Sequence, residues 1–272
     1  GYPLYTALLS KLSATGVAYA LDESDGWQPN VEDMARLITP RTKGIAVINP
    51  NNPTGSIADK KTLDAIVALA KAHNLLLLSD EIYDKLTFDE APITSLAACA
   101  GEHPCVTFGG IAKCYLSPGL RVGWGIISGA IDHLSEYAEA VARLERVRLC
   151  SSYPAQAAVA AALDGPQNHI AHMRTKLIAR TERLMRGLSS IDGIECVPPQ
   201  GAFYAFPRLT DGIDDNAFVL ELMEQTGIVC VPGSGFGQAA GTAHLRFVVL
   251  PPEEIIDRAM DRLSGFMAHR HR

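Results

Sequence analysis

Residues 106–124 read VTFGGIAKCYLSPGLRVGW. A short β-branched run ends in two glycines, Lys113 follows, and Arg121 opens a second apolar run that extends from Val122 to Ile127. The pattern predicts a strand, a tight loop and a second strand. Open α/β sheets bind ligands at such loops, where burial lowers the pKa of a lysine toward that of an amine nucleophile and an arginine can pair with a phosphate. Taken alone, the pattern is explained better by an ordinary solvated lysine.

Two further stretches carry polar side chains to the ends of buried strands. Residues 48–55 read INPNNPTG, in which turn-forming residues close an apolar strand. Residues 75–83 read LLLLSDEIY, so that an all-apolar run leads directly into Asp80 and Tyr83. The second strand shows no alternation, which predicts that both of its faces are covered. Residues at helical spacing separate the two strands, and this βαβ pattern predicts a parallel sheet.

Together with Lys113 and Arg121, these motifs resemble the fold-type I aminotransferases that use pyridoxal 5'-phosphate. Within that family the chain is most similar to the glutamate-pyruvate (alanine) aminotransferases, and the combination of motifs in this order is highly specific. The resemblance covers almost the whole chain. Its other stretches are YPLYTA (2–7), DES (22–24), ITPRT (38–42), RLC (148–150), GAFYAFP (201–207) and HLRF (244–247).

The resemblance implies an α/β fold, with a three-layer large domain around a mostly parallel sheet and a smaller α+β domain. We expect the large, cofactor-binding domain at residues 1–165, an interdomain helix at 166–190 and the small domain at 191–272. The chain begins at Gly1, already inside one of these motifs. In the family a substantial N-terminal stretch precedes this motif. We therefore expect an N-terminal part to be absent, including a glycine-containing loop that binds the cofactor phosphate and an aromatic ring that stacks on the pyridine.

The periodicity of the chain predicts the individual elements. Strands are expected at residues 17–19, 44–48, 75–79, 105–108, 122–127, 194–197, 203–207, 228–231 and 244–250. Helices are expected at about 4–14, from 31, around 63–70 with a stop at Asn74, and at 130–149, 153–163, 166–189, 217–226 and 253–267. Trp27 is expected to be a packing residue, and the glycine-rich residues 232–237 a mobile loop near the substrate.

Composition narrows the class of protein. The chain has 272 residues, 47% of them hydrophobic, and a net charge of -6, so it can bury a large core and offers no overall basic character for nucleic acid or anionic lipid. No apolar run approaches the ~18 residues of a membrane span. Six scattered cysteines suggest neither a metal site nor a disulfide framework, which favours a reducing compartment and thus the cytoplasm.

The resemblance assigns the cofactor chemistry to three residues. Lys113 is implied to form the Schiff base and, once released, to move the proton at the substrate Cα. Asp80 ends an apolar strand, where a carboxylate is costly without a cationic partner, and the protonated pyridine nitrogen would be that partner. Tyr83 is implied to hydrogen-bond the 3'-oxygen of the cofactor, although a core aromatic residue would also fit. Glu81 is expected to point away from the site.

Three further residues are implied to bind the cofactor or the substrate. Asn52 would join Tyr83 at the 3'-oxygen and contribute to substrate binding, Arg121 would pair with the phosphate, and Arg246 would bind the substrate α-carboxylate. The alternatives are that Asn52 only forms a turn, that Arg121 is a solvated arginine before a strand, and that Arg246 is an arginine of an edge strand. The chain departs from the family pattern at Gly110 and Ala112, where a serine commonly helps to hold the phosphate; this weakens the expected cofactor affinity.

The function implied is a ping-pong aminotransferase that moves an amino group from alanine or glutamate to pyruvate or 2-oxoglutarate. Homodimerisation is expected, as in the family. Another pyridoxal-phosphate enzyme of the same fold, such as a β-eliminating C-S lyase, would use the same residues. A non-catalytic aminotransferase-like sensing module or an inert fragment is the alternative of a different class.

Overall fold

The computed structural model describes residues 1–89, 91–130, 134–147 and 149–270. Contacts group them into two compact units, which we call the C-terminal unit (Gly1–Gln28, Asn51–Ser56 and Met173–Arg272) and the sheet unit (Pro29–Pro50 and Ile57–His172). The expected division at residues 165 and 190 follows the chain linearly and stays a prediction. The contact-based division differs from it because residues 1–28 and 51–56 pack with the C-terminal residues.

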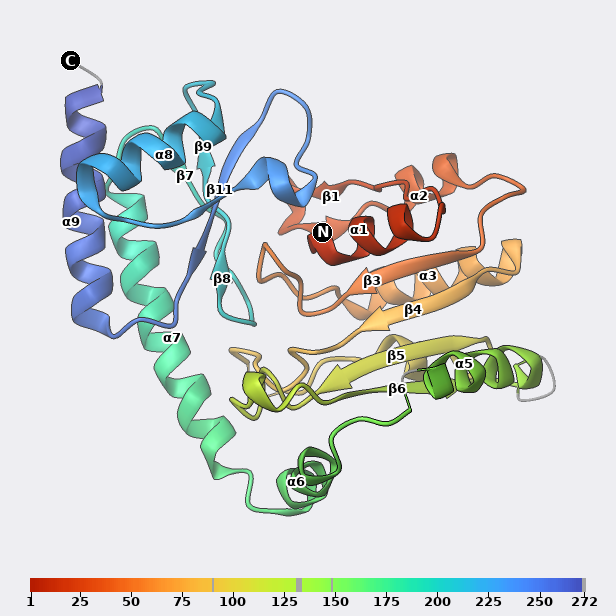
Figure 1. Ribbon diagram of the computed structural model, residues 1–272. Helices are drawn as coiled ribbons and strands as arrows, with labels where there is room; N and C mark the ends of the chain where they lie inside the picture. The colour runs from red at the N-terminus through yellow and green to blue at the C-terminus, as the bar shows by residue number, and fades with distance from the viewer. Residues whose placement is uncertain (90, 131–133, 148, 271–272) are drawn as a thin grey trace. The chain divides into compact units, whose positions relative to one another are not determined.

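A four-stranded sheet organises the sheet unit. Its strands are β3 (Gly44–Ile48), β4 (Leu76–Asp80), β5 (Cys105–Gly110) and β6 (Gly123–Ser128), in the order β3-β4-β5-β6 (Figure 1). The first three are parallel, and β6 runs antiparallel to β5. The predicted mostly parallel sheet is therefore confirmed. Along β4, fully buried positions (Leu77, Ser79) alternate with half-buried ones, so its two faces are covered unequally.

Helices connect and cover these strands. Helix α3 (Lys60–His73) links β3 to β4; it begins after the N-cap Asp59, whose carboxylate accepts from the Thr62 amide at 2.6 Å, and ends at Asn74 in a left-handed conformation. Its buried face consists of Leu63, Ile66, Val67 and Ala70. The other helices of this unit are α2 (Val31–Leu37), α4 (Leu96–Ala100), α5 (Ser135–Val147) and α6 (Tyr153–Asp164).

The expected helices correspond to observed ones with shifted ends. The helix predicted at 130–149 is α5, and its predicted residues 131–133 and 148 lie outside the described residues. The short helix α4 was not predicted. Glu81 explains how five residues can form it, because its carboxylate accepts from Ser95 Oγ at 2.8 Å and from the Leu96 amide at 3.1 Å. Glu81 thus supports the start of a helix.

The C-terminal unit is built on an antiparallel sheet and long helices. The strands β10 (Val231–Pro232), β11 (Ala243–Val248), β9 (Arg208–Leu209) and β7 (Ile194–Glu195) lie side by side, and β8 (Tyr204–Ala205) also pairs with β11. The helices are α1 (Pro3–Lys11), α7 (Asn168–Ser189), α8 (Asp215–Thr226) and α9 (Glu253–Arg270). Helix α9 runs along α7 (Figure 1), where Arg180 pairs with Glu253 and Arg183 with Asp257.

In this unit one predicted strand was wrong and one observed strand was missed. The strand predicted at residues 17–19 was wrong: these residues have no regular structure, and the first strand is the two-residue β1 (Leu21–Asp22), which pairs with β2 (Gln28–Pro29). β propensity favours 17–19, but a strand also needs a partner in register, and the neighbouring turn provides one only at 21–22. Strand β9 was not predicted, since two residues give no periodicity.

Aromatic side chains fill part of the core of the C-terminal unit. Trp27, Phe206 and Phe236 are buried together, and the partly buried Leu21, Val197 and Val231 pack against them. The Trp27 and Phe206 rings meet edge to face, with centroids 5.8 Å apart. Trp27 is therefore the packing residue that the sequence suggested.

Candidate active site

Lys113 lies in the loop that follows β5. The Ser117 amide donates to the Ile111 carbonyl and the Leu116 amide to the Lys113 carbonyl, both at 3.2 Å, so the loop is compact. The Lys113 Nζ atom lies 5.8 Å from the centroid of the Tyr83 ring, and Tyr83 is only 3% exposed. The structure thus brings the predicted lysine and the predicted tyrosine together.

Strand register explains why Asp80 lies at the same edge of the sheet. In the parallel ladder Asp80 is opposite Phe108 of β5, and the Glu81 amide donates to the Phe108 carbonyl at 3.0 Å. The Asp80 carboxylate accepts from the Ile82 amide at 3.2 Å, which orients it within the turn. The carboxyl ends of β4 and β5 therefore present Asp80, Tyr83 and Lys113 from adjacent loops.

A buried thiol joins these two loops. Cys114 Sγ lies 3.4 Å from the Ile82 carbonyl and 3.4 Å from Asp84 Oδ1. Burial raises the pKa of the Cys114 thiol to about 12, and the Asp84 carboxylate adds to the shift. The thiol therefore remains a hydrogen-bond donor at neutral pH and ties the residue after Lys113 to the turn after Asp80. Sequence reasoning missed this role, because a lone cysteine carries no signal of its contacts.

The two glycines before the lysine are packed closely against β6. A Cβ atom on Gly109 would lie 2.5 Å from Trp124 Nε1, and one on Gly110 would lie 3.1 Å from both Ile82 Cδ1 and the Val122 carbonyl oxygen. A serine at position 110 would thus crowd its neighbours. The departure from the family pattern at Gly110 has a local packing reason, whereas nothing in the structure explains Ala112.

Arg121 ends the same segment. It has a left-handed backbone, with φ 54°, and its exposed side chain donates from Nη1 to the Pro118 carbonyl at 2.7 Å. The guanidinium thus lies over its own loop and keeps further donors.

Asn52 and Arg246 form a second group, within the C-terminal unit. Arg246 Nη1 donates to Asn52 Oδ1 at 3.1 Å, although 194 residues separate them. The Arg246 Cζ atom lies 4.8 Å from the ring centroid of Tyr204 and 4.6 Å from that of Phe236. Its Nε atom is buried and makes no hydrogen bond. The guanidinium of Arg246 is thus a planar cation held by aromatic rings, and it has an N–H donor without a hydrogen bond. Such a group is suited to binding a carboxylate.

The loop at residues 51–56 positions Asn52. Its Gly55 has φ +70°, and a Cβ atom there would lie 2.5 Å from Pro199 Cβ. The Gly55 carbonyl accepts from the amides of Gln200 and Gly201, at 2.8 and 2.9 Å. The glycine of the Asn-Pro-Thr-Gly motif therefore allows close approach to residues 199–201, which fixes the loop within the C-terminal unit.

The neighbouring asparagines have structural roles. Asn49 Oδ1 accepts from the Ala58 amide at 3.0 Å, and Asn51 Oδ1 accepts from the Thr54 hydroxyl at 3.0 Å. Phe236 is a contact of Arg246 that sequence reasoning missed. The glycine-rich segment expected to be a loop is instead a short 3-10 helix, η4 (Gly233–Phe236), in which Phe236 is buried. The lone aromatic residue among glycines was the available signal.

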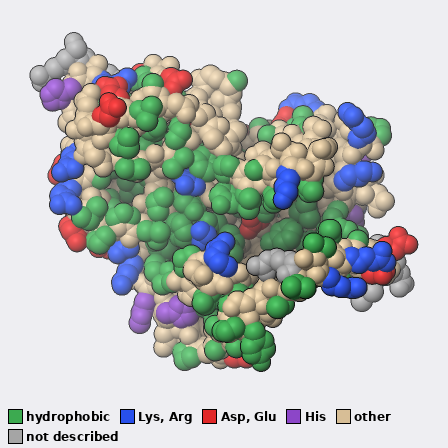
Figure 2. Space-filling view, in the orientation of Figure 1, with side chains coloured by type: hydrophobic (Ala, Val, Ile, Leu, Met, Phe, Trp, Pro, Cys, Tyr) green, Lys and Arg blue, Asp and Glu red, His purple; other side chains and the backbone are tan. Residues whose placement is uncertain are grey.

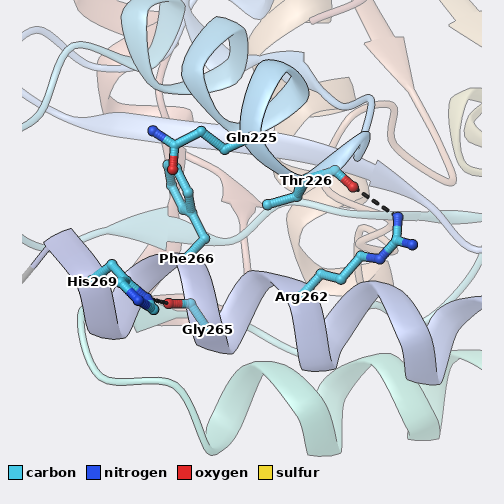
Figure 3. A pocket seen from close by; sticks show the side chains of 6 residues that line it. All are labelled: Gln225, Thr226, Arg262, Gly265, Phe266 and His269. Carbon is cyan, nitrogen blue, oxygen red and sulfur yellow. Dashed lines mark hydrogen bonds between the residues drawn. The ribbon is translucent and has the colours of Figure 1, made fainter.

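A separate pocket of about 560 Å³ lies between α8 and α9. Figure 3 shows its lining residues; Arg262 donates to the Thr226 carbonyl at 2.8 Å and His269 contacts the Gly265 carbonyl at 2.6 Å. Both side chains contact backbone carbonyls, and none of the predicted site residues lines the pocket. It therefore adds nothing to the candidate site.

Within the described ranges, no three His, Cys, Asp or Glu side chains are arranged to hold a metal ion, and no disulfide is formed. None of the helices over these ranges has the length and apolar character of a membrane span.

The residues of the sheet unit fit pyridoxal phosphate in chemical type. The cofactor offers an aldehyde, a phenolic oxygen, a ring nitrogen and a phosphate. A primary amine (Lys113), a phenol (Tyr83), a carboxylate (Asp80) and a guanidinium (Arg121) are the matching groups, and the first three are presented by adjoining loops of one sheet edge.

Comparisons with known proteins agree with this assignment. The model of the family "Aminotransferase class I and II" matches residues 1–263. The chain is 42% identical to the alanine aminotransferase of Mycobacterium tuberculosis over 98% of its own length, and 38% identical to the glutamate-pyruvate aminotransferase of Escherichia coli over 99%. It spans 63% of the length of the former and 68% of the latter.

Solved structures show the same likeness. The alanine aminotransferase of Pyrococcus furiosus superposes with a TM-score of 0.96 at 41% identity, covering 99% of this chain and 69% of that one. The tyrosine aminotransferase of Leishmania infantum superposes with a TM-score of 0.93 at 27% identity, covering 99% of this chain and 67% of that one. The predicted fold class and family resemblance are confirmed: this chain belongs to the class I and II aminotransferase family.

Proposed function

We propose that this protein is a pyridoxal-phosphate-dependent aminotransferase that transfers an amino group between alanine or glutamate and pyruvate or 2-oxoglutarate. The observation that carries the proposal is the position of the Lys113 amine, 5.8 Å from the centre of the buried Tyr83 ring at the carboxyl end of a parallel sheet. The names of the relatives in Mycobacterium tuberculosis and Escherichia coli support the choice of substrates.

Bound pyridoxal phosphate supplies an electron sink for the carbanion formed at the substrate Cα. Lys113 would bind the cofactor through its amine and, when free, move the proton at the substrate Cα. A primary amine is needed because it must serve both as nucleophile and as base. Asp80 would hold the proton at the ring nitrogen, since a carboxylate at the end of an apolar strand stabilises a facing cation.

Tyr83 and Asn52 would donate to the phenolic oxygen, and Arg121 would pair with the phosphate. In the structure Asn52 accepts from Arg246 through Oδ1, so its amide nitrogen remains the end that can donate. This division lets one asparagine serve both cofactor and substrate binding.

Arg246 would bind the α-carboxylate of both substrates. Amino donor and 2-oxo acceptor share that carboxylate, so one arginine can serve both halves of a ping-pong reaction. The rings of Tyr204 and Phe236 fix the guanidinium plane, and a fixed plane orients the substrate Cα bond that must break.

A homodimer is part of the proposal. Hydrophobic side chains gather on the surface over α6 (Figure 2), and among the residues of this helix Tyr153 is 80% and Leu163 45% exposed. Large exposed apolar side chains close together are typical of a surface that a partner covers. A cytoplasmic location is supported by the six cysteines, all of which are free thiols in the structure, as is usual in a reducing compartment.

The test is to incubate the protein with pyridoxal phosphate, L-alanine and 2-oxoglutarate and to quantify the products. Pyruvate and glutamate in equal amounts are expected. Release of ammonia from a donor with a β-leaving group, without a new amino acid, would instead indicate β-elimination. No turnover and no cofactor absorption band would favour a non-catalytic module. Equal rates with aromatic donors would contradict the proposed substrate class.

A further inference from the structure

A buried carboxylate outside the candidate site is connected to Arg246. Asp215, in the first turn of α8, is 4% exposed. Its Oδ2 accepts from the Ser234 amide at 2.6 Å and from Gln238 Nε2 at 3.0 Å, while its Oδ1 accepts from Asn216 Nδ2 at 3.0 Å. A carboxylate can be buried only when donors satisfy it, and two of these three donors, Ser234 and Gln238, belong to residues 233–238.

Asp215 is not needed to cap its helix. The adjacent Asp214 is the N-cap, and its side chain accepts from the Ala217 amide at 2.8 Å. The contacts of Asp215 instead lead away from the helix to Ser234 and Gln238. Helix formation therefore does not account for a second, buried aspartate at this position.

Gln238 extends the connection to β11. Because Asp215 is an acceptor, the Gln238 amide must present its nitrogen to it and its oxygen to the other side. That oxygen accepts from the His244 backbone amide at 2.9 Å and lies 3.2 Å from His244 Nδ1. His244 is 2% exposed and precedes Arg246 by two residues on the same strand. Asp215 and Gln238 thus join the segment to the strand that carries the arginine.

The segment held in this way contains Phe236. Its ring centroid lies 4.6 Å from Arg246 Cζ, and the side chain is 5% exposed. At the start of the segment, a Cβ atom on Gly233 would lie 2.4 Å from Gln238 Oε1 and 2.7 Å from His244 Cβ. The segment is therefore packed closely against the two residues that anchor it.

We propose that Asp215 and Gln238 are positioning residues for Arg246: by anchoring residues 233–238 they hold Phe236 against the guanidinium and so set the affinity for the substrate α-carboxylate. The inference rests on the proposed function, in which Arg246 binds that carboxylate. It predicts an effect on substrate binding from residues that do not touch the substrate.

The first test compares kinetics. Asp215→Asn leaves one acceptor oxygen for the three donors that Asp215 now accepts from, and Gln238→Ala removes the link to His244. In both variants the KM for the amino acid and for the 2-oxo acid should rise about tenfold, while kcat stays within about twofold and the cofactor band is unchanged. Reaction with a primary amine that lacks a carboxylate should be unaffected. Asp211→Asn, an exposed carboxylate of the same unit, is the matched control.

The second test needs neither cofactor nor turnover. Chymotrypsin should cleave after Phe236 faster in Asp215→Asn and Gln238→Ala than in the wild type or Asp211→Asn, as mapped by mass spectrometry. Unchanged KM values or a fall in kcat alone would overturn the proposal, and so would equal cleavage after Phe236. A wild type without transaminase activity would refute the proposed function, whereas faster cleavage in the two variants would still support the anchoring of Phe236.

Discussion

The two units hold their functional side chains by different means. In the sheet unit, Asp80 and Lys113 follow neighbouring parallel strands, so backbone register brings them to one edge. In the C-terminal unit, Arg246 is oriented by Asn52, Tyr204 and the anchored Phe236, which are distant in sequence. The first group depends on the ladder and the second on side-chain contacts. Substitutions should therefore act on chemistry in one unit and on substrate affinity in the other.

The largest effect is expected at the amine. Lys113→Ala should lower kcat by at least about 10³-fold, because the variant loses both the group that binds the cofactor and the base that moves the Cα proton. Steady-state rates with alanine and 2-oxoglutarate measure the loss. Lys85→Ala, which removes an exposed lysine near Tyr83, should retain activity. Comparable losses in both variants would contradict the role given to Lys113.

A smaller effect, of a different kind, is expected at the arginine. Arg246→Lys keeps the charge but loses the planar fork that Asn52 and the aromatic rings orient, so KM for both substrates should rise about 10- to 100-fold with a lesser change in kcat. Arg186→Lys, on the exposed face of α7, is the control. An unchanged KM in Arg246→Lys would contradict the claim that substitutions in the C-terminal unit act on substrate affinity.

The ladder can be tested through the paired glycines. Gly109→Ala places a Cβ atom 2.5 Å from Trp124 Nε1 and should destabilise the protein by about 1–3 kcal/mol, whereas Gly110→Ala, with nearest contacts at 3.1 Å, should cost less. Denaturant unfolding measures both values. Equal unfolding free energies for the two variants would contradict the idea that close packing of β5 against β6 holds the lysine loop.

The smallest effect concerns the cap of α3. Hydrogen bonds from Thr62 hold the pKa of Asp59 below its usual value, so this stabilisation is present above a pH of about 3.9 and is lost as the pH falls through the lowered pKa. Asp59→Ala should therefore cost about 1 kcal/mol at pH 7 and less near pH 3. Asp59→Asn, which keeps an acceptor, is the control. A difference in unfolding free energy independent of pH would contradict this reasoning.

The sequence predicted the sheet unit better than the C-terminal unit for a physical reason. Apolar runs and turn residues are local signals, and strand ends then place Asp80 and Lys113 without further information. The link between Asn52 and Arg246 spans 194 residues and depends on the packing of Gly55 against Pro199. Likewise, no local pattern predicts that Cys114 joins two loops or that Asp215 anchors Phe236.

The central claim is that the Lys113 amine carries the cofactor. The most direct measurement is to load the protein with pyridoxal phosphate, reduce it with borohydride, digest it and locate the labelled peptide by mass spectrometry. The account predicts one stable label, on Lys113, and its loss in Lys113→Ala. A label on any other lysine, or none in a protein whose absorption band shows bound cofactor, would contradict it.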